Sequence, residues 1–134
     1  MPSRLRARLS DKIMALVLIV DDSPTEQHVF CKVLERHGYD TVVASDGEEA
    51  IATAEQVKPE VIVMDVVMPG MNGFQATRKL SRNPATRGIP IVIVSSKGLE
   101  TDRIWGLRQG AAQYLVKPVK EEQLAAAVEA ALTG

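Results

Sequence analysis

Two kinds of apolar pattern alternate along the chain, and this alternation limits the fold more than any other feature. Short runs rich in β-branched residues lie between segments with helical spacing. These runs cover residues 15–20, 41–44, 61–64, 89–94 and 114–116. Several runs are apolar at nearly every position, which is expected of strands that helices cover on both faces. The pattern predicts an α/β fold with a doubly wound, five-stranded parallel sheet and helices on both faces.

Each segment between these runs carries an apolar stripe at helical spacing, so each is expected to form a helix with one covered face. The stripes are Val29/Phe30/Val33/Leu34, Ala50/Ile51/Ala54, Phe74/Thr77/Leu80, Ile104/Leu107/Ala111 and Leu124/Ala127/Val128/Ala131. Ser23 followed by Pro24 is typical of a helix start, whereas Gly38 and Gly110 are typical of helix ends. We therefore expect one domain of alternating strands and helices.

The first residues differ from the rest of the chain because they are basic. The charged residues of this segment are Arg4, Arg6, Arg8, Asp11 and Lys12. Four basic residues against one acid leave a net charge of +3. We expect a basic N-terminal extension over residues 1–13 and the folded domain over residues 14–134. The sequence leaves open whether translation starts at Met1 or at Met14.

Composition argues against several classes of protein. The 134 residues hold 16 Lys and Arg against 17 Asp and Glu, so we expect no nucleic-acid partner. The longest apolar run, residues 13–20, is far shorter than the roughly 18 residues that a membrane span needs. The single cysteine, Cys31, cannot form an intramolecular disulfide. A lone thiol favours a reducing compartment, and we expect the cytoplasm.

Polar residues follow the carboxyl ends of the expected strands. Asp21 and Asp22 follow the first run, Asp65 follows the third, and Ser95 and Lys117 follow the fourth and fifth. In an open α/β sheet these ends line one crevice, and ligands bind where the strand order reverses. With the flavodoxin-like order 2-1-3-4-5, the three aspartates converge on one pocket. The serine and the lysine then lie on its rim.

Three carboxylates in one pocket repel one another by roughly 3 kcal/mol per ionised pair, at about 5 Å and an effective dielectric of about 20. A cation must offset this repulsion, or one carboxylate must keep its proton. Oxygen donors without a nearby His or Cys favour Mg²⁺. A carboxylate can also act as a nucleophile in phosphoryl transfer, which makes Asp65 a candidate, with Lys117 neutralising phosphoryl oxygens.

Four separated motifs in this chain occur in the order found in a known family. They are LIVDDS at 18–23, VMDVVMPGMNG at 63–73, the serine pair at 95–96 and YLVKP at 114–118. In these motifs the chain resembles the receiver domains of bacterial two-component response regulators. The resemblance implies a phosphoacceptor signalling domain with a histidine kinase as its phosphodonor. It implies no enzyme activity beyond the domain's own phosphorylation and dephosphorylation.

The resemblance also assigns roles at the acidic pocket. Asp65 would be phosphorylated, and Mg²⁺ would bind to Asp22, Asp65 and the backbone carbonyl of Val67. Asp21 would hold a water of the ion, and Lys117 would contact the phosphoryl oxygens. Because the side chain of Val67 is apolar, it cannot position an attacking water, and we expect a long-lived phosphate.

A second group of residues would respond to phosphorylation. Ser95 would be the switch hydroxyl, with Ser96 as the alternative, and Tyr114 would be the aromatic partner of Ser95. The bond between Lys117 and Pro118 would be cis, a conformation that X-Pro bonds adopt at modest cost.

The resemblance further implies an output surface for a protein partner. This surface would comprise the helix within residues 100–111, the strand at 114–116 and the helix around 124–131. Trp105 lies about 100° round its helix from the apolar stripe. It either covers the edge of the sheet or anchors the partner, and the sequence does not separate these alternatives.

A narrower resemblance, in residues 72–78 and 100–111, points to stand-alone receivers of type IV pilus systems, of the PilH type that regulates twitching motility. A phosphate sink for a shared kinase is an alternative with the same chemistry. A phosphatase-like enzyme with an aspartate nucleophile is more distant, since such enzymes resemble Asp-x-Asp-x-Thr at the first strand. The sequence has neither glycine motif typical of nucleotide sites.

Overall fold

A computed structural model describes residues 15–134 as alternating strands and helices; the expected extension over residues 1–13 and Met14 lie outside the described residues. The strands are β1 (Leu16–Val20), β2 (Asp40–Ala44), β3 (Val61–Met64), β4 (Ile91–Ser95) and β5 (Gln113–Val116). The helices are α2 (Pro24–Arg36), α3 (Gly47–Val57), α4 (Gly73–Arg82), α5 (Glu100–Arg108) and α6 (Glu121–Thr133). The predicted alternation of strands and helices is confirmed.

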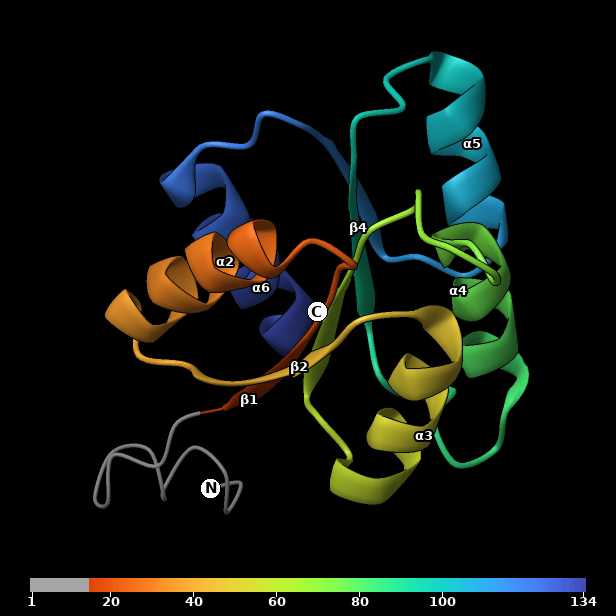
Figure 1. Cartoon of the computed structure of the whole chain (residues 1–134), viewed down its shortest axis with the longest axis horizontal. Helices are drawn as coiled ribbons and strands as arrows, with labels where there is room; N and C mark the ends of the chain where they lie inside the picture. Colours follow the sequence, from red (N-terminus) through yellow and green to blue (C-terminus); the bar gives the residue numbers. More distant parts are fainter. Residues whose placement is uncertain (1–14) are drawn as a thin grey trace.

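All five described strands are parallel and follow the order β2-β1-β3-β4-β5. Helices α2 and α6 cover one face of the sheet, and α3, α4 and α5 cover the other (Figure 1). The predicted doubly wound fold and its strand order are therefore confirmed. In this order β1 and β3 are neighbours at the point where the direction of winding reverses, which is where the ligand site of such sheets lies.

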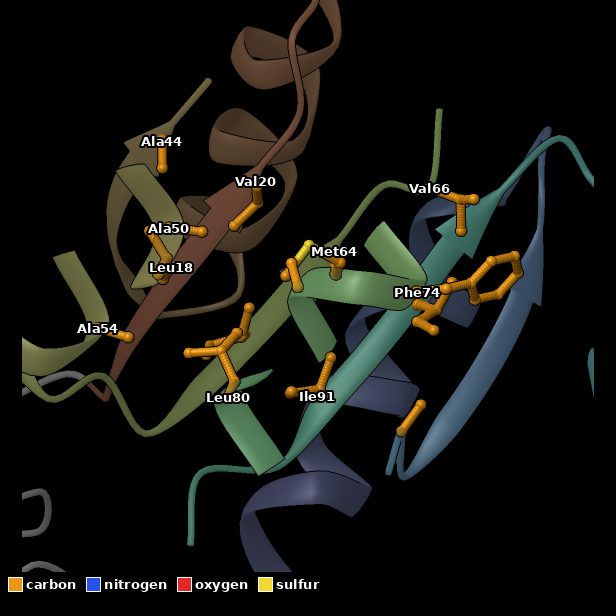
Figure 2. Close-up of a cluster of buried hydrophobic side chains, with 14 of the residues drawn as sticks. Leu18, Val20, Ala44, Ala50, Ala54, Met64, Val66, Phe74, Leu80 and Ile91 are labelled. Carbon is orange, nitrogen blue, oxygen red and sulfur yellow. The ribbon is translucent and has the colours of Figure 1, made fainter. Parts of the chain in front are cut away.

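Strands β1, β3 and β4 each contribute to two separate cores. In β1, Leu18 and Val20 belong to the cluster beneath α3 and α4, whereas Val17 and Ile19 belong to the cluster beneath α2 and α6. Figure 2 shows the first cluster, in which Leu80 of α4 lies against the sheet. Because successive side chains of a strand point to opposite faces, only a sheet covered on both faces produces this pattern.

The expected helix boundaries are present at the ends of α2 and α5. Ser23 is the N-cap of α2, its hydroxyl accepts a hydrogen bond from the backbone N–H of Glu26 at 3.3 Å, and Pro24 opens the helix. Gly38 and Gly110 follow α2 and α5 with φ of 88° and 117°, a backbone conformation that glycine adopts without strain.

Strand β4 begins at Ile91, two residues later than the apolar run predicts. Pro90 has no N–H and cannot donate to a neighbouring strand, although its carbonyl accepts from Ile62 N–H at 3.0 Å. The same strand extends one residue further than expected, so Ser95 is its last residue and is fully buried.

Two of the predicted apolar stripes are partly wrong. Val29 of α2 is 48% exposed, while the other three members of its stripe are buried. In α5 both Ile104 and Leu107 are exposed, and Gly106 is the only buried residue of the helix. The cause is the place of α5 at the outer strand of the sheet, where it packs on β5 and on the neighbouring helix α4. At a short edge helix, a single close contact takes the place of an apolar stripe.

No helix within residues 15–134 is both long enough and apolar enough to cross a membrane.

We predict that Leu80→Ala lowers the free energy of unfolding by about 2–5 kcal/mol, because it removes a buried side chain from the cluster beneath α4. Leu99→Ala is the matched control, since Leu99 is 70% exposed, and its effect should stay within about 0.5 kcal/mol. Urea unfolding measures both changes. Equal effects of the two substitutions would contradict the assigned core.

Candidate functional site

The register between β1 and β3 brings the acidic residues together. Val20 pairs with Met64, so the next residues, Asp21 and Asp65, lie side by side at the carboxyl edge of the sheet. The N–H of Asp65 donates to the Val20 carbonyl at 2.9 Å, which continues the ladder by one residue. Carboxylate oxygens of Asp21, Asp22 and Asp65 all lie within 4.8 Å of one another. The structure thus places the three predicted acids in one cluster.

A close backbone approach fixes the segment that carries Asp65. The N–H of Gly73 donates to the Val66 carbonyl at 2.8 Å, and a Cβ on Gly73 would lie 2.0 Å from the Asp65 carbonyl oxygen. Only glycine allows the start of α4 to pack this closely against the end of β3. Val67 lies in the loop between these elements, and its side chain is 60% exposed. The loop therefore holds Asp65 while leaving Val67 at the surface.

Lys117 reaches the cluster from the end of β5. Its peptide bond to Pro118 is cis, as predicted, and its N–H donates to the Ser95 carbonyl at 2.8 Å. Its Nζ lies 3.3 Å from Asp65 Oδ1 and 3.4 Å from Asp21 Oδ2. Lys117 therefore lies where the sequence predicts a charge-neutralising group, with one ammonium group between two buried carboxylates.

Glu26 of α2 is a further acid at the site that was not predicted from the sequence. Its Oε1 lies 2.5 Å from Lys117 Nζ, closer than either aspartate. Ser23 and Glu26 have the spacing of a capping box, in which Glu26 would accept from the Ser23 N–H. That N–H donates instead to Asp21 Oδ1 at 2.9 Å. Because Asp21 satisfies this donor, the side chain of Glu26 is free to reach Lys117.

The buried carboxylates hold their protons more tightly than free aspartates do. Burial, reinforced by the negative charge of Asp21, raises the pKa of Asp65 from 3.8 to about 6, and Lys117 only partly opposes this shift. Burial raises the pKa of Asp21 as well. Burial lowers the pKa of Lys117, but the hydrogen bond to Glu26 and the nearby acids outweigh it and raise that pKa overall. The cluster is therefore short of positive charge.

The donor set fits a hard divalent cation. Asp21, Asp22 and Asp65 offer carboxylate oxygens, Asp22 is exposed to solvent, and neither histidine of the chain belongs to the cluster. Oxygen donors with an open, water-accessible side suit Mg²⁺, which keeps several of its waters. Two positive charges would also offset the repulsion that one lysine leaves. The chemistry of these side chains thus agrees with the metal site that the sequence suggests.

The predicted switch residues lie beside this cluster. The Ser95 hydroxyl accepts from the backbone N–H of Lys97 at 3.1 Å, whereas Ser96 is exposed. Tyr114 is buried, and its hydroxyl donates to the Lys97 carbonyl at 2.7 Å. Burial raises the pKa of Tyr114, an effect that the nearby Ser95 hydroxyl opposes. Of the two serines, only Ser95 lies in the interior next to Tyr114.

Residues 17–129 match the family model of the response regulator receiver domain. The chain belongs to this family. It is 52% identical over 121 residues to Protein PilH of Pseudomonas aeruginosa, covering 90% of this chain and all of that protein. Longer relatives also match, and the chain spans 52% of one and 25% of another. The resemblance to receiver domains and to PilH, expected from the sequence motifs, is confirmed.

Solved structures of other receiver domains share the fold. Chemotaxis protein CheY4 of Vibrio cholerae superposes with a TM-score of 0.84 at 32% identity, over 90% of this chain and all of that chain. The receiver domain of the sensor histidine kinase PA1611 from Pseudomonas aeruginosa PAO1 gives a TM-score of 0.84 at 30% identity, over 91% of this chain and all of that one. That structure has a magnesium ion coordinated in its active site cleft.

We predict that Asp65→Asn stabilises this receiver domain in metal-free buffer near neutral pH. Between the ordinary pKa of 3.8 and the folded value of about 6, the folded state binds the proton of Asp65 more tightly than the unfolded state does. Stability contributed by this group therefore falls as the pH rises through that window, and asparagine avoids the loss. We expect a gain of about 1–2 kcal/mol at about pH 7.5, since water screens part of the effect.

Urea unfolding in the presence of EDTA measures this difference. At about pH 4.5 the advantage of the variant should shrink to less than half, because wild-type Asp65 is then largely protonated in the folded state. An advantage that is independent of pH would show that repulsion and burial of the charge are not its cause.

Proposed function

We propose that this receiver domain accepts a phosphoryl group on Asp65 from a histidine kinase and thereby changes a protein-binding surface. The observation that carries the proposal is the convergence of buried Asp65 with two further aspartates and the Lys117 ammonium group. A packing role does not explain this arrangement, because buried like charges destabilise the fold. We propose a phosphoacceptor signalling domain rather than an enzyme acting on a separate substrate.

In the proposed reaction, a carboxylate oxygen of Asp65 attacks the phosphorus of the kinase phosphohistidine. An O–P bond forms, the N–P bond breaks, and the imidazole nitrogen leaves with its electron pair. Lys117 Nζ, which already donates to Asp65 Oδ1, donates to a phosphoryl oxygen as charge develops there. The pKa of about 6 leaves Asp65 mainly ionised, and hence nucleophilic, at neutral pH.

We propose Mg²⁺ as the cofactor, as in the magnesium-containing receiver domain of PA1611. Asp22, Asp65 and the backbone carbonyl of Val67 would hold the ion, with Asp21 holding one of its waters. When bound, the ion supplies positive charge that neutralises and orients phosphoryl oxygens.

Phosphorylation would be read out through Ser95 and the elements near it. We propose that the Ser95 hydroxyl turns to a phosphoryl oxygen, and that the surface of α5, β5 and α6 changes with it. Exposed apolar residues on this surface include Leu99, Trp105 and Val116, which are 70%, 48% and 42% exposed. Tryptophan is a typical anchor for a protein partner, and neighbouring apolar residues exclude water from such an anchor. These exposed residues favour an output partner over a phosphate sink, which needs only its kinase.

The likeness to PilH over the full length of that protein supports a narrower proposal. We propose that this receiver acts in twitching motility driven by type IV pili, in the cytoplasm. We also propose that the receiver domain comprises residues 14–134, with residues 1–13 as an extension outside the core.

The deciding experiment is incubation with acetyl phosphate and Mg²⁺, followed by mass analysis of the intact protein. The wild type should gain about 80 Da, the mass of one phosphoryl group, and Asp65→Asn should gain nothing. An adduct on both proteins would contradict Asp65 as the phosphoacceptor.

Two further variants test the metal site in the same assay. Asp22→Asn should raise the Mg²⁺ concentration needed for half-maximal labelling at least tenfold, on the order of the loss of one charged ligand. Asp40→Asn removes the same charge at the start of β2, at the amino ends of the strands and away from the acidic cluster. It should leave the Mg²⁺ concentration for half-maximal labelling unchanged. Equal shifts in both variants would point to overall charge rather than to a ligand.

We predict that Glu26→Gln speeds this phosphorylation. Glu26 holds Lys117 at 2.5 Å, so its removal leaves the ammonium group to Asp65 and to the incoming phosphoryl oxygens. The initial rate with acetyl phosphate should rise about threefold, in line with the strength of a partly exposed ion pair. Glu122→Gln is the control, since Glu122 is an exposed acid in the first turn of α6. A rate equal to that of this control would show that Glu26 does not restrain Lys117.

A further inference from the structure

A glycine occupies the only buried position of α5. Gly106 lies within this helix, where glycine is less favourable than alanine because it loses more backbone freedom. A Cβ at this position would lie 2.8 Å from Cδ2 and 3.1 Å from Cε2 of Tyr114, and 3.1 Å from Cδ1 of Ile93. The ring of Tyr114 therefore occupies the space that a side chain at Gly106 would need.

Contacts on other elements hold the same ring in place. The hydroxyl of Tyr114 donates to the Lys97 carbonyl at 2.7 Å. The ring of Phe74, from α4, lies nearly parallel to it, with an interplanar angle of 15° and centroids 6.4 Å apart. Phe74 itself belongs to the buried cluster (Figure 2). Tyr114 is only 9% exposed as a result.

This position links Tyr114 to both sides of the proposed phosphorylation site. Lys97 accepts from the Tyr114 hydroxyl through its carbonyl and donates through its N–H to the Ser95 hydroxyl at 3.1 Å. On the other side, Phe74 directly follows Gly73, whose backbone packs on the carbonyl end of Asp65. The ring thus contacts the loop that orients the serine and the helix that begins beside the aspartate.

We propose that Gly106 is a positioning residue for Tyr114. Its missing side chain opens a recess on α5 in which the ring lies without any phosphoryl group on Asp65. The hydroxyl of the ring in turn holds the backbone of Lys97, whose N–H donates to the Ser95 hydroxyl. The recess is independent of the proposed function; its effect on phosphorylation rests on that function.

A methyl group at position 106 would overlap with the ring of Tyr114 in its present position. The helix backbone is fixed by its own hydrogen bonds, and Ile93 can move its terminal carbon by a bond rotation. The two closest ring atoms belong to a rigid unit that Phe74 and the hydroxyl contact confine. Either the ring leaves the recess or α5 moves away from the sheet, and both changes expose Tyr114.

Fluorine NMR of protein labelled with 3-fluorotyrosine tests this directly. The chain has two tyrosines, Tyr39 and Tyr114, and Tyr39→Phe assigns their signals. In the wild type a soluble paramagnetic agent should broaden the Tyr114 signal weakly. In Gly106→Ala the broadening should increase at least threefold, whereas Gly88→Ala, with nothing within 4 Å of the added carbon, should match the wild type. Unchanged protection in Gly106→Ala would overturn the proposal.

Thermal unfolding keeps the test decisive if Gly106→Ala folds poorly. With Tyr114 present, the substitution should lower the Tm by about 5 °C through the clash. In a Tyr114→Ala background the same substitution should raise the Tm by about 3 °C, because alanine is the better helix former and the space is free. The same shift in both backgrounds would show that the glycine does not serve the ring.

Phosphorylation by acetyl phosphate and Mg²⁺ separates this role from a purely structural one. In Gly106→Ala the rate of labelling should fall at least threefold at a temperature where the variant is fully folded, while Gly88→Ala keeps the wild-type rate. A normal rate with an exposed ring would overturn the link from Tyr114 to Ser95. Absence of labelling in the wild type, with a protected ring, would refute the proposed function and leave the recess intact.

Discussion

Repulsion between buried carboxylates is the constraint around which the functional edge of this sheet is organised. Parallel pairing of β1 with β3 places Asp21 and Asp65 one residue beyond the same register position, so their backbones cannot move apart without breaking the ladder. They share the ammonium group of Lys117, which also pairs with Glu26. The folding energy of the sheet thus holds an unfavourable charge cluster together. Such a cluster is stabilised by any ligand that brings positive charge.

The neighbouring backbone is built to keep that cluster in place. Gly73 packs against the carbonyl of Asp65 at a distance that excludes any side chain, and the Ser23 N–H donates to one oxygen of Asp21. These contacts use backbone groups, which cannot change rotamer. Lys117 and Glu26, by contrast, are long side chains at the rim. Asp21 and Asp65 are therefore fixed, while Lys117 and Glu26, which would respond to a phosphoryl group in the proposed reaction, can move.

The fold could be predicted from the sequence because its main determinants are local. Apolar runs covered on both faces, and capped helices between them, follow from neighbouring residues alone. The convergence of the acids also followed, since strand ends in a parallel sheet share one edge. The position of Glu26 was not predicted because two carboxylates compete for the Ser23 N–H. Asp21 accepts from this N–H, which Glu26 would use in a capping box. The prediction that Ile104 and Leu107 lie on a covered helix face was wrong, because packing at the outer strand overrides the periodicity.

The position of α5 at the outer strand of the sheet suits it to the signal transmission proposed above. A helix that buries one residue gains little from the hydrophobic effect, so its separation from the sheet costs less than that of α4, which buries five residues. What α5 does bury, Gly106, lies against Tyr114, a side chain that also contacts the loop beside Ser95. A change at Asp65, the proposed phosphoacceptor, would therefore reach the least buried helix of residues 15–134 through one aromatic ring. The strands that carry the acids need not move, because α5 packs at the outer strand β5, whereas the acids follow β1 and β3.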